Sequence, residues 1–147
     1  MNDYEQSRST FEALANTVKN FDENEATTRH QLIDHTLIDC LGWPREQIQC
    51  EKYHQGDYLD YVLGNPEGQA VLEAKRSSNT FDAPAGVKSG IISLSVIRDY
   101  SKTNASAIDQ AMQYCQKSGI AIAILSNGNQ YLAFLGSRAD GKPPTAG

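Results

Sequence analysis

An acid-x-Lys triplet stands at the end of a predicted strand, with Glu73 and Lys75 at its two ends, and Asp60 lies in the strand before it. Strand residues two positions apart share a face, so Glu73 and Lys75 project to the same side. A predicted turn at 64–68 folds Asp60 back alongside Glu73. Asp60 interrupts the otherwise apolar stretch 58–63, where a carboxylate is costly to bury without a cation.

Two carboxylates and an ammonium group at the end of a hairpin suit phosphodiester hydrolysis. Carboxylate oxygens can hold Mg²⁺, which polarises the phosphodiester and lowers the pKa of a bound water. Lys75 would orient that water or neutralise the charge that develops on phosphorus. A structural alternative stays open: an ion pair between Glu73 and Lys75, with Asp60 satisfied by backbone amides. A second acid-x-Lys triplet, 140–142, has no strand around it.

Two predicted helices supply further polar residues. Glu25 and Arg29 lie about 40° apart around one helix, within the arc of its buried face. An inward Glu25 is a candidate metal ligand, and the alternative is an i,i+4 salt bridge between the two. Gln110 and Tyr114, also four residues apart, lie on or beside the buried face of a later helix. Tyr114 could equally be a core residue.

Apolar periodicity predicts the helices that carry these residues. A first helix spans about 4–21, and its apolar stripe is expected to be buried. A second begins at the N-cap Asn24 and ends near Gly42 and Pro44. A third spans 106–117. The stripe of the first helix consists of Phe11, Leu14, Ala15, Val18 and Phe21.

The strands follow from alternating or continuous apolar runs. The first three are expected to form a meander, and the fourth is expected to be buried on both faces. The segment 91–100 reads as either a strand or a short helix. The fold class is therefore α/β, with a mixed sheet of about five strands flanked by helices. The predicted strands are 48–53, 58–63, 69–75, 120–125 and 130–135.

Composition predicts one soluble domain. The chain has 147 residues and a net charge of -5, which argues against a protein that coats duplex DNA. Three scattered cysteines without a Cys-x-x-Cys pair indicate a reduced cytoplasmic protein. No signal segment or apolar run long enough for a membrane span is visible. Residues 1–136 are predicted to form the domain, and 137–147 a flexible linker to a downstream region.

An ordered series of motifs resembles the N-terminal nuclease domain of type I restriction enzyme motor subunits, within the PD-(D/E)xK superfamily. The resemblance spans Glu25 to about Leu135, although Leu59 stands where the superfamily's name has proline. The motifs are Glu25-Ala26-Thr27-Thr28-Arg29, Leu32-Ile33-Asp34, Leu41-Gly42-Trp43, Asp60-Tyr61-Val62-Leu63, Val71-Leu72-Glu73-Ala74-Lys75 and Gln110-Ala111-Met112-Gln113-Tyr114.

The resemblance implies a restriction-endonuclease-like core that cleaves DNA with Mg²⁺, for which Mn²⁺ can substitute. Asp60, Glu73 and Lys75 match the catalytic triad of that family, and Glu25 matches its helical acid. Gln110 with Tyr114 matches its Gln-x-x-x-Tyr element. The implied partners are DNA and a fused or separate ATPase motor or sensor. The composition adds two expectations: self-association into a homo-oligomer that binds DNA, and no membrane partner.

Three functions compete at this point. The leading expectation is a metal-dependent endonuclease domain, the N-terminal effector of a larger restriction or phage-defence protein. The runner-up is a catalytically inactive module of the same fold that binds nucleic acid or a partner protein. Retention of Asp60, Glu73 and Lys75 together favours the enzyme. A small-molecule hydrolase lacks any recognisable nucleophile arrangement.

Overall fold

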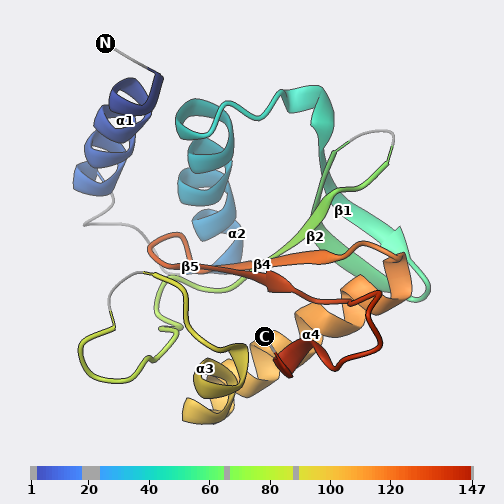
Figure 1. Cartoon of the computed structure of the whole chain (residues 1–147). Coiled ribbons are helices and arrows are strands. Elements are labelled where there is room, and N and C mark those ends of the chain that lie inside the picture. The colour runs from blue at the N-terminus through green and yellow to red at the C-terminus, as the bar shows by residue number, and fades with distance from the viewer. Residues whose placement is uncertain (1–2, 18–23, 65–66, 88–89, 147) are drawn as a thin grey trace.

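A five-stranded mixed sheet carries helices on both faces in the computed structural model, which describes residues 3–17, 24–64, 67–87 and 90–146 (Figure 1). This arrangement confirms the predicted α/β class. The strands are β1 Ile48–His54, β2 Asp57–Leu63, β3 Ala70–Ala74, β4 Ile122–Ser126 and β5 Tyr131–Leu135.

The strands lie in sequence order across the sheet. Antiparallel pairing joins β1, β2 and β3, so the predicted meander is confirmed. β3 and β4 run parallel, and β5 returns antiparallel to β4. A parallel pair needs a long crossover, and here it contains α3 (Leu94–Tyr100) and α4 (Lys102–Ser118). Residues 91–100 therefore include a short helix and not a strand.

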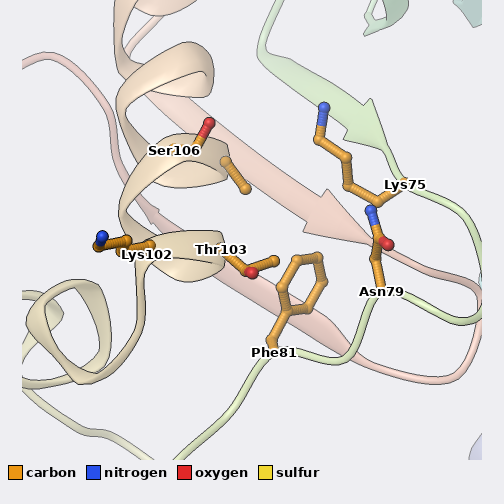
Figure 2. Close-up of a pocket in the computed structure, with 7 residues that line it drawn as sticks. Lys75, Asn79, Phe81, Lys102, Thr103 and Ser106 are labelled. Carbon is orange, nitrogen blue, oxygen red and sulfur yellow. The ribbon is translucent and has the colours of Figure 1, made fainter.

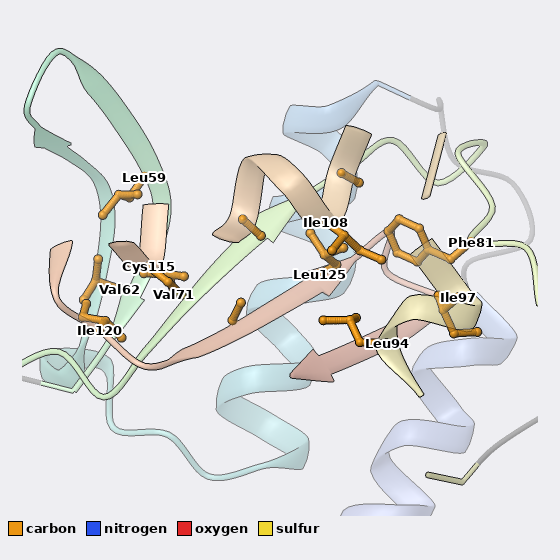
Figure 3. Packing of buried hydrophobic residues seen from close by; sticks show 13 residues of the cluster. Leu59, Val62, Val71, Phe81, Leu94, Ile97, Ile108, Cys115, Ile120 and Leu125 are labelled. Atoms are coloured by element: carbon orange, nitrogen blue, oxygen red, sulfur yellow. The ribbon is translucent and has the colours of Figure 1, made fainter. Parts of the chain in front are cut away.

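Apolar side chains form one cluster on each face of the sheet. On one face, Val71 and Leu125 pack against Ile108 and Cys115 of α4 (Figure 3). On the other face, Ile33 and Leu37 pack against Leu72 and its neighbours in β2 and β3. α4 thus covers the face to which Glu73 and Lys75 belong by strand alternation.

The predicted second helix is a run of shorter helical segments. It contains α2 (Glu25–Thr28) and two π-helical segments, η2 (Arg29–Ile33) and η3 (Thr36–Cys40). Asn24 is the N-cap as predicted, and its side chain accepts a hydrogen bond from the Thr27 N–H at 2.8 Å. The run ends near Gly42, whose φ of 71° lies in the left-handed region that favours glycine. Five-residue hydrogen-bond spacing marks the π segments, a feature frequent at functional sites.

Two helix predictions were wrong in part. α1 (Asp3–Thr17) buries none of its residues, and Phe11 is 39% exposed, because among the described elements the helix lies mainly against η3. Val18 and Phe21 of the predicted stripe lie outside the described residues. α4 begins four positions before Ser106, because Ser101 caps it by accepting a hydrogen bond from the Asn104 N–H at 3.1 Å.

The prediction that the fourth strand is buried on both faces was also wrong. Ala123 and Leu125 are fully buried toward α4, whereas Ile122 is 42% exposed on the other side. The helical run 25–40 packs its apolar side chains against β2 and β3, with only Ile124 of β4 at the margin of that cluster. Apolar residues alone therefore did not indicate which part of the sheet was covered.

The segment after β5 ends in a short helical turn, η5 (Pro144–Ala146), which contacts α3. Within this segment Arg138 pairs with Asp140 at 2.7 Å. The domain boundary at 136 and the linker role of 137–147 stay predictions. Among the described helices, none combines the length and apolar character needed to cross a bilayer.

Candidate active site

Asp60 lies where β2 and β3 separate. The antiparallel register pairs Tyr61 with Leu72 and ends there, so Asp60 and Glu73 are the next residues beyond the paired ladder. The Oδ2 atom of Asp60 accepts a hydrogen bond from the backbone N–H of Ala74 at 2.8 Å. The structure therefore brings the Asp60 carboxylate next to the strand segment that carries Glu73, as the hairpin predicted.

Glu73, Lys75, Gln110 and Tyr114 form one chain of hydrogen bonds from β3 to α4. The Lys75 Nζ atom lies 2.7 Å from Glu73 Oε1 and donates to Gln110 Oε1 at 2.9 Å. The Gln110 Nε2 atom donates in turn to the Tyr114 hydroxyl at 2.9 Å. These bonds use two of the three protons of the ammonium group. The position of the ammonium group is therefore fixed by two hydrogen bonds, and among the described residues its third proton remains available to a substrate.

Glu73 is almost fully buried, with 5% of its surface exposed. Burial and then the negative charge of Asp60 raise its pKa to about 7, although Lys75 acts in the opposite direction. Glu25 contributes a smaller upward effect on the same pKa. Negative charge is therefore concentrated around Glu73, and an added cation would favour its ionised form.

The sequence placed Arg29 inward and offered Glu25 as its salt-bridge partner, but the structure gives it other partners. Its Nη1 atom lies 3.4 Å from Asp60 Oδ1 and 3.2 Å from Glu51 Oε1. Its guanidinium carbon stands 5.2 Å from the centre of the Tyr61 ring. These partners replace the considered salt bridge to Glu25. The sequence could have indicated Asp60 as the partner of Arg29, because a buried arginine requires an acid and Asp60 interrupts an apolar strand.

The irregular backbone of β1 brings Glu51 to this arginine. Glu51 has a φ of 51°, in the left-handed region that non-glycine residues rarely adopt. The register pairs its two neighbours, Cys50 and Lys52, with β2 but omits Glu51 itself. Such a conformation costs about 1–3 kcal/mol and is concentrated at functional sites.

The donor set at the end of β2 and β3 fits Mg²⁺ through two residues. Asp60 and Glu73 supply carboxylate oxygens, and Mg²⁺ is often held by one or two carboxylates together with several waters. Burial and then the negative charge of Asp60 raise the pKa of Glu73, so a cation held by both acids would reduce their repulsion. Within the described ranges, no three His, Cys, Asp or Glu side chains are grouped closely enough to hold a metal. Glu25 as a third ligand stays a prediction.

The contacts of the structural alternative are also present. Glu73 and Lys75 form the ion pair that it requires, and a backbone amide satisfies Asp60. Two features go beyond it: Gln110 binds Lys75 from a different element, and Glu73 keeps a perturbed pKa despite the ion pair. Perturbed titratable groups in such clusters are candidates for catalysis.

The chain was compared with protein-family models, curated proteins and solved structures, and none of them matches it significantly.

Proposed function

We propose that this chain is a Mg²⁺-dependent endonuclease domain of the PD-(D/E)xK type that hydrolyses phosphodiester bonds in DNA. The observation that carries the proposal is the placement of Asp60 beside buried Glu73, with Lys75 held on the same side by Gln110. The mixed five-stranded sheet agrees with a restriction-endonuclease-like core without being specific to it.

Each residue has a separate role in the proposed reaction. Asp60 and Glu73 would hold the cation, and Mg²⁺ bound there polarises the phosphodiester and lowers the pKa of a bound water. The ammonium group of Lys75 stabilises the negative charge that develops on the phosphoryl oxygens. Gln110 positions Lys75 through the 2.9 Å hydrogen bond, and Tyr114 fixes the orientation of the Gln110 amide.

The family resemblance supports a larger assembly around this domain. We place the domain at the N-terminus of a restriction or phage-defence protein in the cytoplasm. A net charge of -5 gives it little general attraction to phosphate. DNA affinity would then come from a fused or separate ATPase motor or sensor, or from a homo-oligomer that places two sites across a duplex.

Cleavage of supercoiled plasmid tests the proposal. The full chain is incubated with Mg²⁺, with Mn²⁺ and with chelator, beside Asp60→Asn, Glu73→Gln and Lys75→Met purified in parallel. Each substitution should lower the rate by about 10²–10³-fold or more, because each removes a metal ligand or a charge that stabilises the transition state. Circular dichroism and thermal unfolding show whether each variant keeps the fold.

The second acid-x-Lys triplet provides the matched control. Asp140→Asn and Lys142→Met make the same chemical changes outside any strand, in the segment 137–146, and should leave cleavage unchanged. Wild-type activity in any folded triad variant, or cleavage that continues in chelator, would overturn the proposal. An RNA substrate tested in the same way shows which nucleic acid is cut.

The second candidate is a catalytically inactive module of the same fold that binds nucleic acid or a partner protein. One observation favours it: both oxygens of Asp60 already have partners, the Ala74 N–H and Arg29. Binding of DNA that persists in the triad variants, with no cleavage by the wild type, would favour this function over the enzyme.

A further inference from the structure

A pocket of about 400 Å³ opens beside the candidate active site, between the first turns of α4 and the segment that follows β3 (Figure 2). We call it the α4 pocket. It shares Lys75 with the site. It is also lined by Asn79, Phe81, Lys102, Thr103 and Ser106.

The volume of the α4 pocket indicates what kind of ligand it could bind. Pockets that bind small molecules have volumes of about 300–1,000 Å³, whereas one water molecule occupies about 30 Å³. A volume of about 400 Å³ is therefore too large for a single ion. It suits a unit that combines a phosphate with a sugar and a base.

The lining combines an apolar surface with polar groups on α4. Figure 2 shows Thr103 next to the Phe81 ring, with Ser106 further along α4. Phe81 is 8% exposed, so its ring has little freedom to move. Lys102 is an exposed residue at the rim of the pocket, and Figure 2 shows its ammonium group directed away from the Phe81 ring, so a change of side-chain rotamer is needed to bring its positive charge to the pocket. The hydroxyl groups of Thr103 and Ser106 lie on the same helix. This combination recognises an anionic group attached to an apolar one.

Side-chain amides hold the pocket wall in place. Gln130 bonds both backbone groups of Phe81, at 2.8 and 3.0 Å. The buried Asn104 likewise bonds both backbone groups of Asp82, at 3.2 and 2.7 Å. Asn127, also buried, donates to the carbonyl of Asn79 at 2.7 Å. The wall is preorganised, which lowers the entropic cost of binding.

The polar row of α4 connects the pocket to the catalytic cluster. Thr103, Ser106, Gln110 and Tyr114 are three or four residues apart, which places them along one face of the helix. From Thr103 to Gln110 the helix advances about 10 Å, at 1.5 Å per residue. A group bound near Thr103 is therefore separate from a phosphate that reacts beside Lys75.

Given the proposed nuclease function, on which this step rests, we infer that the α4 pocket receives one nucleotide of the substrate strand next to the scissile phosphate. Lys102 and the hydroxyls of Thr103 and Ser106 contact its phosphate. Phe81 and the aliphatic part of Lys75 contact its sugar and base. The pocket thereby fixes the strand along α4, with the neighbouring phosphate directed to Asp60 and Glu73.

The test is binding of a fluorescently labelled oligonucleotide in Ca²⁺ by the full chain and by Lys102→Gln, Thr103→Val and Ser106→Ala. Each substitution should weaken binding about 3–10-fold. For Lys102→Gln, the salt dependence of log K should fall by about 0.7–0.9, the contribution of one phosphate contact. Lys52→Gln removes the same charge from β1 at the far edge of the sheet and is the matched control with no expected change. Thermal unfolding identifies any misfolded variant.

A methylphosphonate scan locates the contact. Replacing one phosphate at a time with a neutral group should weaken binding by the wild type at one position near the cleavage site, and that effect should disappear in Lys102→Gln. Binding by Lys102→Gln and Thr103→Val equal to that of the wild type would overturn the inference while plasmid cleavage continues to support the nuclease. Absence of metal-dependent cleavage in the wild type overturns the nuclease instead; a loss of oligonucleotide affinity in Lys102→Gln then supports nucleotide binding in the α4 pocket but overturns its place next to a scissile phosphate.

Discussion

The Nη1 atom of Arg29 lies 3.4 Å from the Oδ1 atom of Asp60. Arg29 belongs to the helical run 25–40, whose apolar residues Ile33 and Leu37 pack on the sheet face opposite α4. The two charged side chains are mostly buried, with exposed fractions of 18% for Arg29 and 17% for Asp60. Arg29 therefore compensates the charge of an acid that an apolar strand would otherwise exclude.

Replacing Arg29 should destabilise the fold through Asp60. We expect Arg29→Met to lower the free energy of unfolding by about 2–3 kcal/mol at neutral pH, because it leaves a mostly buried carboxylate without its cation. Glu51→Gln removes the exposed partner of the same arginine and should cost less than about 1 kcal/mol. Urea unfolding in chelator measures both. Equal losses in the two variants would show that Asp60 does not depend on Arg29.

Stability should depend on pH through Glu73. Its pKa in the folded protein is raised from 4.5 to about 7, mainly by burial and by Asp60. Between these values the folded protein keeps a proton that the unfolded chain releases, so stability falls as the pH rises. Relative to Glu73→Gln, the wild type should lose about 3 kcal/mol across this range. Parallel pH profiles of unfolding for the two proteins in chelator would contradict the assignment.

Metal binding should oppose this loss. If Asp60 and Glu73 hold Mg²⁺ as proposed, the ion needs Glu73 in its ionised form, so Mg²⁺ affinity should increase as the pH rises through 7. Calorimetric titration in two buffers of different protonation enthalpy should detect the released proton.

Mg²⁺ and Mn²⁺ should support cleavage, whereas Ca²⁺ should bind but support it poorly. Chelator should stop cleavage without unfolding the domain; a large drop in thermal stability would indicate a structural metal instead.

Gln110 and Tyr114 should act through Lys75 and not through the metal. Gln110→Ala removes the acceptor that holds the ammonium group, so kcat should fall about tenfold while Mg²⁺ affinity is unchanged. Tyr114→Phe should have a smaller effect, because the Gln110 to Lys75 bond persists. Gln113→Ala changes an exposed glutamine on the same helix and is the matched control. Loss of Mg²⁺ affinity in Gln110→Ala would show that the amide lies among the metal ligands.

Local pattern was sufficient to predict the central elements of this protein. The alternation of apolar residues predicted the β1–β2–β3 meander, and the turn after β2 placed Asp60 near Glu73. The period of two placed Glu73 and Lys75 on one face. These relationships depend on neighbours within a hairpin or a strand, where covalent geometry limits the possible arrangements.

Tertiary packing decided the rest. Arg29 meets Asp60, and Gln110 meets Lys75, only because helices distant in the sequence cover opposite faces of the sheet. Tertiary packing also decided the exposure of Phe11 and Ile122. Apolar periodicity shows which side of an element prefers burial, but not whether another element covers that side. The sequence alone determined the residue types and the faces on which they lie; only the folded chain determined their partners.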